Sequence, residues 1–256
     1  MPKLTVVKVG GKLIEDAEQL SGFLDAFAAL PGLKLLVHGG GRDATRFAER
    51  LNIPTQLING RRITDAATLE VAVMVYAGLT NKRIVARLQA RGVNALGLCG
   101  ADGDVIRSAL RPVKDINYGL VGDVERVDTS TLATLVTSGL TPVFSAITHD
   151  GEGQLLNTNA DTIAARVAVA MSTLFDTSLR YCFEYPGVLY DLADPAQTFP
   201  EVSVINIENL CATGQISAGM LPKLDNAAYA KTHGVSHVSI CGVDNLATQI
   251  NATWIH

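Results

Sequence analysis

The chain has 256 residues, of which 48% are hydrophobic, enough for a substantial core in one large α/β domain or two small lobes. The formal net charge is −4, and the Lys and Arg residues are scattered, which excludes a basic nucleic-acid surface and a polybasic membrane patch. We therefore expect neither a nucleic acid nor a membrane as a partner.

The cysteines and the N-terminus indicate a reducing compartment. The four cysteines are widely spaced and form no CxxC motif, so neither a zinc site nor a disulfide framework is indicated. No cationic, apolar leader precedes Lys3, and no apolar stretch approaches the ~20 residues of a membrane span. We expect an unprocessed cytoplasmic protein with free thiols at Cys99, Cys182, Cys211 and Cys241.

The beginning of the chain alternates strand and helix patterns. Residues 4–9 (LTVVKV) form an apolar run typical of a strand buried on both faces, and two glycines follow it. Residues 15–30 carry apolar side chains at helical spacing, and residues 35–42 (LLVHGGGR) form a second apolar run that ends in three glycines. A strand, a helix and a second strand make a βαβ unit, which predicts a parallel sheet.

A hairpin and a long helix come next. Residues 55–64 (TQLINGRRIT) contain Asn59-Gly60 between apolar residues, a strong hairpin signal that places Arg61 and Arg62 at the turn. Thr64 and Asp65 are suited to cap a helix, and the apolar pattern continues at helical spacing to about residue 91.

The rest of the chain continues the alternation. Strands are expected at 93–98, 141–147, 179–183, 188–190 and 236–240, with short β signals at 119–124, and helices at 129–138, 155–171, 207–213 and 220–233. The whole pattern predicts a three-layer α/β fold in a single domain (residues 1–256). Its open, mainly parallel sheet has about eight strands with helices on both faces.

The glycine loops are the first candidates for a ligand site. In open parallel sheets, ligands bind at the carboxyl ends of strands, where both early glycine loops lie. The chain has no GxxxxGK[ST], GxSxG or HExxH motif, and we expect His38 to be a core histidine. Gly97, Gly100 and Gly103 loosely imitate a dinucleotide fingerprint without its acidic partner, which leaves an oxidoreductase as a weak alternative.

Two lysines are unusual for their positions. Lys8 interrupts a buried strand, and buried lysine is rare unless it is paired, so it either makes a structural ion pair or faces an anion across the following glycines. Lys223 begins a helical segment and is the second candidate, although alone it would be a surface lysine.

One acidic residue completes the set. Asp161 follows Asn157 by four positions, so the two share a face if both lie in the first turns of one helix. Glycine loops, two lysines, one carboxylate and no general base suit phosphoryl transfer to an acceptor that is already ionised, because that reaction needs positioning and charge neutralisation.

Seven segments, in this order, resemble those of the acetylglutamate kinases of the amino acid kinase family. The resemblance covers nearly the whole chain. It implies the amino acid kinase fold and ATP-dependent phosphorylation, with Mg²⁺, of the γ-carboxylate of N-acetylglutamate, a step of arginine biosynthesis. The segments are KVGGK (8–12), LLVHGGGR (35–42), NGRRITDAATLEVAVMVYAGLTNKRIV (59–85), GLCGADGDVI (97–106), GLVGDV (119–124), LLNTNADTIAARVA (155–168) and GMLPKL (219–224).

The resemblance implies a catalytic set and two lobes. Lys8 and Lys223 would stabilise the transferring phosphoryl group, and Asp161 would hold both lysines in place. The N-lobe, about residues 1–175, would bind the acylglutamate and contact a second subunit, and the C-lobe, about residues 176–256, would bind the nucleotide.

The resemblance also implies the ligand contacts, without a protein-bound metal site. For the acceptor these are Gly40 and Gly41, together with Arg62 and Asn157 at its α-carboxylate, where the arginine fork would grip two oxygens. For the nucleotide and its phosphates they are Gly10, Gly11, Gly39, Tyr185, Gly187 and Ser217.

The chain departs from the family pattern in three places. Residues 183–185 (FEY) replace a Ser/Thr-Asp pair, and residues 251–256 (NATWIH) replace the usual Gly-Thr ending, so both of these departures lie in the nucleotide half. The chain also starts directly at its first strand, without the extra helix of arginine-inhibited hexamers, so we expect a homodimer that is insensitive to arginine. N-succinylglutamate as the substrate and a catalytically silent acylglutamate sensor stay open as alternatives.

Overall fold

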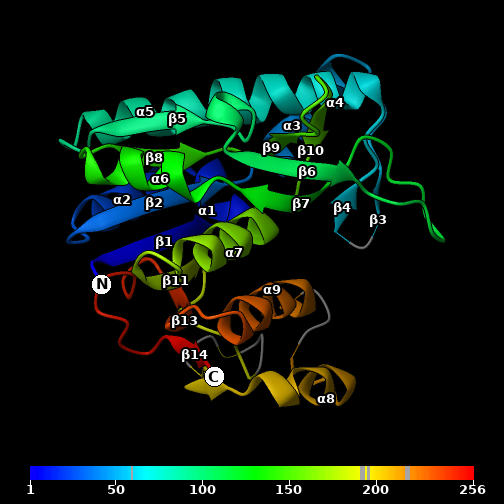
Figure 1. The fold of residues 1–256 in the computed structure, drawn as a ribbon. Coiled ribbons are helices and arrows are strands. Elements are labelled where there is room, and N and C mark those ends of the chain that lie inside the picture. The colour runs from blue at the N-terminus through cyan, green and yellow to red at the C-terminus, as the bar shows by residue number, and fades with distance from the viewer. Residues whose placement is uncertain (59, 191–193, 195–196, 217–219) are drawn as a thin grey trace. The chain divides into compact units, whose positions relative to one another are not determined.

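The computed structural model describes residues 1–58, 60–190, 194, 197–216 and 220–256 (Figure 1). The chain divides into two compact units, which we call the terminal unit (Met1–Leu35 with Ala164–His256) and the middle unit (Leu36–Ile163). The main sheet has eight strands in the order β12-β14-β13-β11-β1-β2-β8-β5. In this main sheet the strands that pair within each unit are parallel, except for β13 with β14, and this confirms the expected α/β fold with a mainly parallel sheet.

The terminal unit contains both ends of the chain. The largest buried side chains of its core include Tyr181 on strand β11 and Phe23 and Phe27 on helix α2. Its elements are β1 (Lys3–Val9), α1 (Gly11–Glu15), α2 (Ala17–Ala28), most of α7 (Ala160–Met171), β11 (Asp176–Phe183), β12 (Glu201–Val202), η3 (Val204–Asn206), α8 (Ile207–Ala212), α9 (Leu221–Thr232), β13 (His237–Gly242) and β14 (Thr253–Ile255).

The middle unit contains the hairpin, the long helix and a second, four-stranded sheet in the order β10-β9-β6-β7. Its elements are the end of β2 (Leu33–His38), α3 (Gly41–Arg50), β3 (Leu57–Ile58), β4 (Arg61–Arg62), α4 (Ala66–Ala72), η1 (Val73–Thr80), α5 (Asn81–Gln89), β5 (Ala95–Leu98), η2 (Asp102–Asp104), β6 (Ile106–Leu110), β7 (Gly122–Val127), α6 (Thr129–Thr137), β8 (Thr141–Phe144), β9 (Ile147–His149) and β10 (Leu155–Asn157).

The hairpin has the expected pairing. β3 and β4 are antiparallel, with Ile58 opposite Arg61 and Leu57 opposite Arg62, and Asn59 of the turn lies outside the described residues. Asp65 caps the following helix, as expected, because its carboxylate accepts a hydrogen bond of 2.8 Å from the backbone N–H of Thr68.

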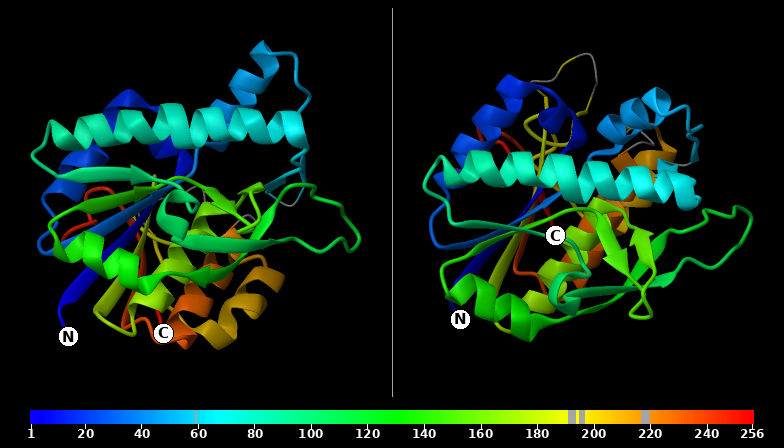
Figure 2. Two further views of the ribbon diagram at one scale, coloured as in Figure 1. Left: turned by 45° about the horizontal axis from the view of Figure 1, so that its top comes forward. Right: turned by 90° about the horizontal axis from the view of Figure 1, so that it is seen from above.

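The long helix differs from the expectation in its middle. α4, η1 and α5 form one continuous helical rod (Figure 2), but η1 is a π-helix, with a wider turn than an α-helix. Apolar periodicity does not reveal such a segment, because the residues of η1 (VMVYAGLT) are mostly apolar and show almost no period of their own. The wider turn carries Tyr76 and Thr80 on its buried side.

The sequence reading is wrong about residues 155–157 and about the sheet to which they belong. They form strand β10, paired antiparallel with β9, and α7 begins only at Ala160, so Asn157 and Asp161 do not share a helix. The short, irregular strands of the four-stranded sheet gave little periodicity to detect. The expected strand at 141–147 is in fact divided into β8 and β9, which belong to different sheets.

Two further differences lie in the terminal unit. In place of the strand expected at 188–190 there is an isolated bridge between Leu189 and Thr198. β14, which the sequence reading missed, pairs antiparallel with β13 and parallel with β12. Within the described ranges no helix is long and apolar enough to cross a membrane, and all four cysteines are free.

Candidate active site

Arg62 is a buried cationic residue on β4, in the hairpin of the middle unit. Its side chain is buried, and its Nη2 donates hydrogen bonds of 2.7 Å to the Gly41 carbonyl and of 2.7 Å to Thr45 Oγ1. Its Nε and Nη1 are also buried, and among the described residues they have no hydrogen-bond partner of normal geometry. A buried donor without a partner is costly, so these two N–H groups mark a place for an anionic ligand.

Asn157 is joined to the same region by Thr64. Asn157 Nδ2 donates to Thr64 Oγ1 at 3.0 Å, and Thr64 Oγ1 donates to the Arg62 carbonyl at 2.9 Å. All three residues are buried. The structure therefore brings together two of the residues expected at the acceptor, Arg62 and Asn157, through Thr64, for which the sequence predicted only a role in capping a helix.

Gly40 lies against the π-helical segment. A Cβ at this position would lie 2.8 Å from Tyr76 Cδ1 and 3.5 Å from Thr80 Oγ1, so a larger residue would have to displace the Tyr76 ring. Gly40 is also the N-cap of α3, and Gly41 is the first residue of that helix, where backbone N–H groups lack helical partners. A helix start of this kind favours a carboxylate or a phosphate.

Tyr76 lies next to both Gly40 and Arg62. Burial raises the pKa of the Tyr76 hydroxyl, while the charge of Arg62 and a hydrogen bond with Arg62 act in the opposite direction. The hydroxyl therefore stays protonated and lies beside the guanidinium. Apolar spacing predicted only that Tyr76 would be on the buried side of a helix.

His38 is a core histidine, as expected. It is fully buried, its Nδ1 donates to the Gly39 carbonyl at 2.7 Å, and its Nε2 accepts from Asn81 Nδ2 at 3.0 Å. Burial and, to a smaller extent, the charge of Lys82 lower the pKa of His38 to about 4, while the hydrogen bond with the Gly39 carbonyl acts in the opposite direction. The ring is neutral at pH 7 and fixes the strand end just before the three glycines.

In the terminal unit, Lys8 and Lys223 lie beside one aromatic ring. The Nζ of Lys8 is 4.9 Å from the centroid of the Phe183 ring, and the Nζ of Lys223 is 5.3 Å from it. Lys8 comes from β1 and is buried, and Lys223 comes from the first turn of α9. The fold thus brings together two lysines that lie 215 positions apart in the chain, and cation–π attraction helps to hold both ammonium groups.

Gly10 has a packing role. Its N–H donates to the Cys182 carbonyl at 2.8 Å, and a Cβ at this position would lie 2.7 Å from Phe183 Cδ1. The N–H that the resemblance assigns to a phosphate is therefore already used by β11. Gly11 begins α1, so its N–H lies in the first turn, where backbone N–H groups have no acceptor within the helix.

Beyond Phe183, the two residues that depart from the family pattern contact Lys12. Its Nζ lies 2.6 Å from Glu184 Oε1 and 5.8 Å from the centroid of the Tyr185 ring. Burial raises the pKa of Glu184, but the hydrogen bond from Lys12 and the charges of Lys12 and Lys223 outweigh it, so the net shift is downward. This carboxylate is ionised at neutral pH.

Three expected nucleotide contacts remain, namely Gly187, Ser217 and Gly39. A Cβ on Gly187 would lie 2.5 Å from Thr253 Oγ1, so this glycine permits the close approach of β14. Ser217 lies outside the described residues. Gly39 follows β2, where a Cβ would meet the Ala160 side chain at an ordinary 3.9 Å.

Asp161 is buried in the first turn of α7, where a negative charge interacts favourably with the helix dipole. Its charge also acts on Arg61, whose pKa it raises against the larger effects of burial and of Arg111. The expected association of Asp161 with both lysines stays a prediction.

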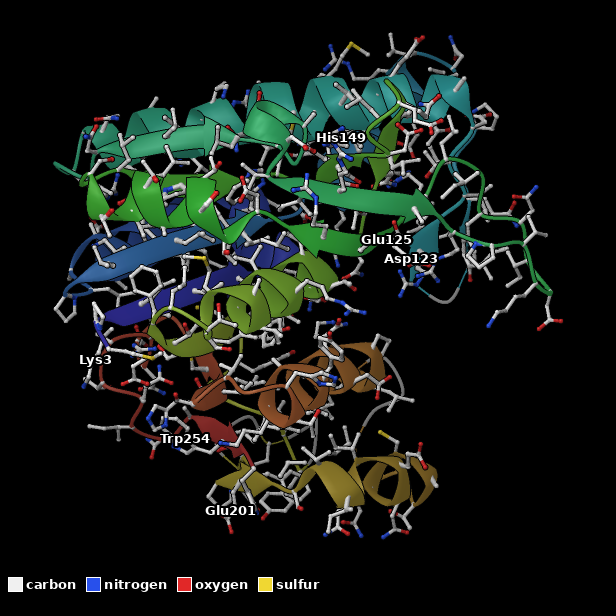
Figure 3. All side chains as sticks on the ribbon, viewed as in Figure 1. Lys3, Asp123, Glu125, His149, Glu201 and Trp254 are labelled. Carbon is white, nitrogen blue, oxygen red and sulfur yellow. The ribbon has the colours of Figure 1, made fainter. Side chains whose placement is uncertain are left out.

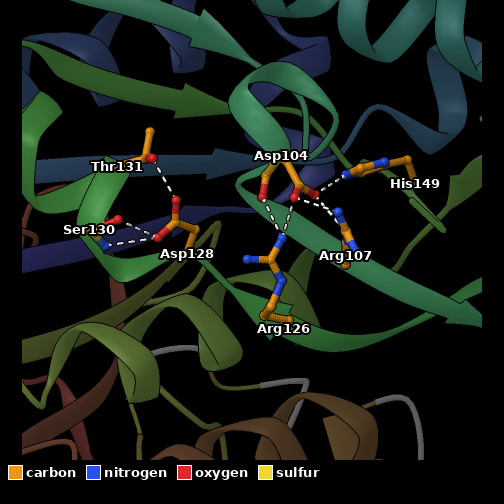
Figure 4. A network of polar contacts seen from close by, with 7 residues as sticks. All are labelled: Asp104, Arg107, Arg126, Asp128, Ser130, Thr131 and His149. Atoms are coloured by element: carbon orange, nitrogen blue, oxygen red, sulfur yellow. Dashed lines mark hydrogen bonds and ion pairs between the residues drawn. The ribbon is translucent and has the colours of Figure 1, made fainter. Parts of the chain in front are cut away.

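A second polar cluster lies elsewhere in the middle unit (Figure 4). Asp104 accepts two hydrogen bonds of 2.7 Å from Arg107, another from Arg126, and contacts His149 Nε2 at 2.9 Å. The hydrogen bond from Arg107 is the main reason that the pKa of Asp104 falls to about 2. Each carboxylate oxygen already has a cationic partner, so this cluster joins β6, β7 and β9 as a structural network.

Comparisons with known proteins show the family of the chain. The profile of the Amino acid kinase family matches residues 3–242. The acetylglutamate kinase of Bacteroides thetaiotaomicron is 57% identical over 238 residues, which cover 93% of each chain. That of Phocaeicola vulgatus is 54% identical over 249 residues, which cover 97% of this chain and 95% of the relative.

Solved structures show the same fold at low identity. The protein smu.665 from Streptococcus mutans matches with a TM-score of 0.77, 24% identity and 98% coverage of each chain. An N-acetylglutamate synthase from Neisseria gonorrhoeae, complexed with coenzyme A and N-acetyl-glutamate, matches with a TM-score of 0.79 and 20% identity, over 99% of this chain and 59% of that one. The chain therefore belongs to the amino acid kinase family, among the acetylglutamate kinases.

Proposed function

We propose that this enzyme transfers the γ-phosphoryl group of ATP to the γ-carboxylate of N-acetylglutamate, in arginine biosynthesis. The single observation that carries the proposal is the buried guanidinium of Arg62, with two unpartnered N–H donors, beside the glycine-initiated helix α3. Relatives that are more than half identical to this chain are named acetylglutamate kinases.

The acceptor would be held at both ends. An unpartnered N–H of Arg62, on Nε or Nη1, would donate to the α-carboxylate, and Asn157, positioned by Thr64, would bind beside it. The backbone N–H groups of Gly40 and Gly41 would receive the γ-carboxylate at the start of α3. A γ-carboxylate is ionised at neutral pH, so the acceptor needs no general base.

The donor would be handled by the terminal unit. The ammonium groups of Lys8 and Lys223 would neutralise charge that develops on the transferring phosphoryl group, and the Phe183 ring supports both. Asp161 would orient the lysines, and Gly11 would offer an N–H to the phosphates. Tyr185, Gly187 and Ser217 stay proposed contacts of the nucleotide.

Mg²⁺ would enter with the nucleotide, because Mg²⁺ is usually held by substrate phosphates and one or two carboxylates. Among the described residues no group of three or more His, Cys, Asp or Glu side chains could hold a metal ion. The ion would neutralise phosphate charge. Side chains and backbone groups of the chain itself would position the two substrates.

A coupled ADP-release assay with N-acetylglutamate and MgATP tests the proposal. We expect turnover that requires both substrates, with formation of an acyl phosphate that hydroxylamine traps. Binding of N-acetylglutamate by calorimetry without ADP release would instead identify the silent sensor and overturn the proposal.

We also propose a homodimer acting in the cytoplasm, where ATP is available and thiols stay reduced. An apolar hollow of about 560 Å³ along α4 and η1, lined by Leu69, Val73, Met74, Leu120 and Leu155 among others, supports the dimer, and Met74 is 54% exposed. Light scattering coupled to gel filtration tests it: the protein should have twice the chain mass, and a monomer or a hexamer would contradict the proposal.

A further inference from the structure

The π-helical segment η1 presents side chains both to solvent and to the core. Side chains stand on both sides of the rod that α4, η1 and α5 form (Figure 3). Within η1, Met74 is 54% exposed, whereas Tyr76, two positions later, is 5% exposed. π-helical turns are rare and occur frequently at functional sites, which makes the inward-facing Tyr76 a candidate for contact with a ligand.

The Tyr76 ring packs against the glycines that begin α3. A Cβ on Gly40 would lie 2.8 Å from Cδ1 and 3.2 Å from Cε1 of this ring, and a Cβ on Gly41 would lie 3.9 Å from its hydroxyl oxygen. The ring therefore runs along the glycine turn, with its hydroxyl at Gly41. Because Gly41 is the first residue of α3, the hydroxyl lies near backbone N–H groups that have no acceptor within the helix.

Arg62 reaches the same glycine from the hairpin. Its Nη2 donates to the Gly41 carbonyl at 2.7 Å and to Thr45 Oγ1 at 2.7 Å. These two bonds fix the guanidinium, while its buried Nε and Nη1 have no partner of normal geometry among the described residues. Gly41 is thus in contact with the Arg62 guanidinium and lies next to the Tyr76 hydroxyl.

The Tyr76 hydroxyl is a donor that needs an acceptor. The hydrogen-bonding partner found for it in the described part of the chain is Arg62, and a guanidinium has donors only. The phenol oxygen can accept from Arg62, but its own proton then requires a further group. Burial raises the pKa of Tyr76, against the charge of Arg62, so the hydroxyl keeps this proton at neutral pH. A buried O–H in this position favours a ligand with acceptor oxygens.

The acidic residue in the first turn of α3 does not fill this place. The Asp43 carboxylate pairs with Arg46 on the same helix. The hydrogen bonds of Arg62 within the described ranges go to neutral groups, the Gly41 carbonyl and the Thr45 hydroxyl. The charge of Arg62 is therefore left for an anionic ligand to balance.

We propose that the Tyr76 hydroxyl is a further substrate contact, which donates a hydrogen bond to the same carboxylate of the acceptor that Arg62 binds. The inference rests on the proposed kinase activity, in which that group is the α-carboxylate of the acylglutamate. Arg62 supplies the charge, and Tyr76 supplies a directed donor. Packing against Gly40 already fixes the ring, so little side-chain freedom is lost when the ligand binds.

The test compares kcat/KM for N-acetylglutamate and for its α-amide in the wild-type enzyme and in Tyr76→Phe, with saturating MgATP. The α-amide keeps the γ-carboxylate that receives the phosphoryl group and replaces the charged α-carboxylate by a neutral group. In Tyr76→Phe we expect kcat/KM to fall roughly tenfold or more for N-acetylglutamate and roughly threefold for the α-amide, because a hydrogen bond to a charged group is the stronger one. The loss should lie mainly in KM.

Tyr190→Phe is the matched control, because it removes the same hydroxyl from an exposed tyrosine, and both of its kcat/KM values should equal those of the wild type. Tyr76→Phe keeps the ring against Gly40. Equal losses on both substrates in Tyr76→Phe would show that the hydroxyl supports the site without contacting the carboxylate, and unaltered kinetics would show that it has no role. Either result overturns the inference while the kinase activity stands.

Calorimetry separates this inference from the kinase assignment. If the wild-type enzyme phosphorylates neither compound, the kinase assignment fails, but the contact still predicts a Kd for N-acetylglutamate that rises roughly tenfold in Tyr76→Phe, and a Kd for the α-amide that rises roughly threefold. An equal Kd for N-acetylglutamate in the wild type and Tyr76→Phe would overturn the contact. A wild-type protein that binds neither compound would overturn it as well.

Discussion

Asn157 Nδ2 lies 3.0 Å from Thr64 Oγ1, and this hydrogen bond joins residues 93 positions apart at the side of the buried Arg62. Thr64 Oγ1 in turn donates a hydrogen bond to the Arg62 carbonyl, so Thr64 connects Asn157 to Arg62. We class Thr64 as a positioning residue, because it acts on the proposed ligand contacts through its neighbours.

Thr64→Val tests this relationship. The variant keeps the shape of the side chain and removes one buried hydroxyl, which costs about 0.5–1.5 kcal/mol per hydrogen bond lost. We expect the KM for the acylglutamate to rise roughly three- to tenfold, with a small change in kcat, and Thr64→Ser to restore the wild-type KM. Equal KM values for Val, Ser and wild type would show that the hydroxyl does not position the site.

Arg62→Ala should weaken acceptor binding more than the chemical step. The loss of a charged donor should raise the KM for the acylglutamate roughly ten- to hundredfold. Steady-state kinetics with saturating MgATP measure it, and Arg50→Ala, an exposed arginine on α3, serves as the control. A fall in kcat at constant KM would place Arg62 at the transferring group instead.

Lys8→Ala should lower kcat, because its charge is needed as charge develops in the transition state. Removing one such group costs about 10²- to 10³-fold in kcat, while the KM for the acceptor should change little. Lys3→Ala changes an exposed lysine on the same strand and should keep wild-type kinetics. An unaltered kcat in Lys8→Ala would refute the assignment.

His38 predicts a dependence of stability on pH. Its folded-state pKa of about 4 lies below the unfolded value of about 6.5, so the unfolded chain takes up the proton first. The contribution is present above pH 6.5 and is lost as the pH falls towards 4. Between pH 7 and pH 5 the free energy of unfolding should drop by about 2 kcal/mol from this group.

Urea unfolding at both pH values measures this drop. His38→Gln should lack it, whatever its own stability at pH 7, because the comparison is made within each variant. His237→Gln, at an exposed histidine of β13, should keep the wild-type drop. A drop of the same size in His38→Gln would assign the acid sensitivity to other groups.

Gly40→Ala should destabilise the middle unit. The added Cβ would lie 2.8 Å from Tyr76 Cδ1, and such overpacking costs about 1–3 kcal/mol. Gly22→Ala, in α2 with no atom within 4 Å of the new Cβ, should instead raise the free energy of unfolding by about 0.4–1 kcal/mol. Thermal or urea unfolding compares the two, and a neutral Gly40→Ala would mean that Tyr76 moves aside freely.

The sequence predicted those features that depend on local patterns. The βαβ beginning, the hairpin with its two arginines, the Asp65 cap and the core position of His38 all follow from periodicity or turn chemistry, and the structure confirms them. Family likeness predicted the fold and the kinase class. It also named Arg62 and Asn157, which Thr64 brings together.

The features that depend on tertiary contacts were not predictable in this way. The residues next to Phe183 in the sequence do not indicate that its ring lies beside both lysines. The packing of Gly10 against the same ring depends on strands far apart in sequence. A three-residue strand such as β10 has too few positions to show a period of two, so the helical pattern after it dominated the reading.

The π-helical segment also sets the rotational phase of the long helix. A residue added to a regular α-helix turns everything beyond it by about 100°, since 3.6 residues make one turn, and a π turn absorbs such an addition. α4 can therefore direct Leu69 inwards while α5, on the far side of η1, directs Asn81 towards His38. Deleting one residue within η1 would leave a helix of ordinary pitch whose two ends could not both face their partners.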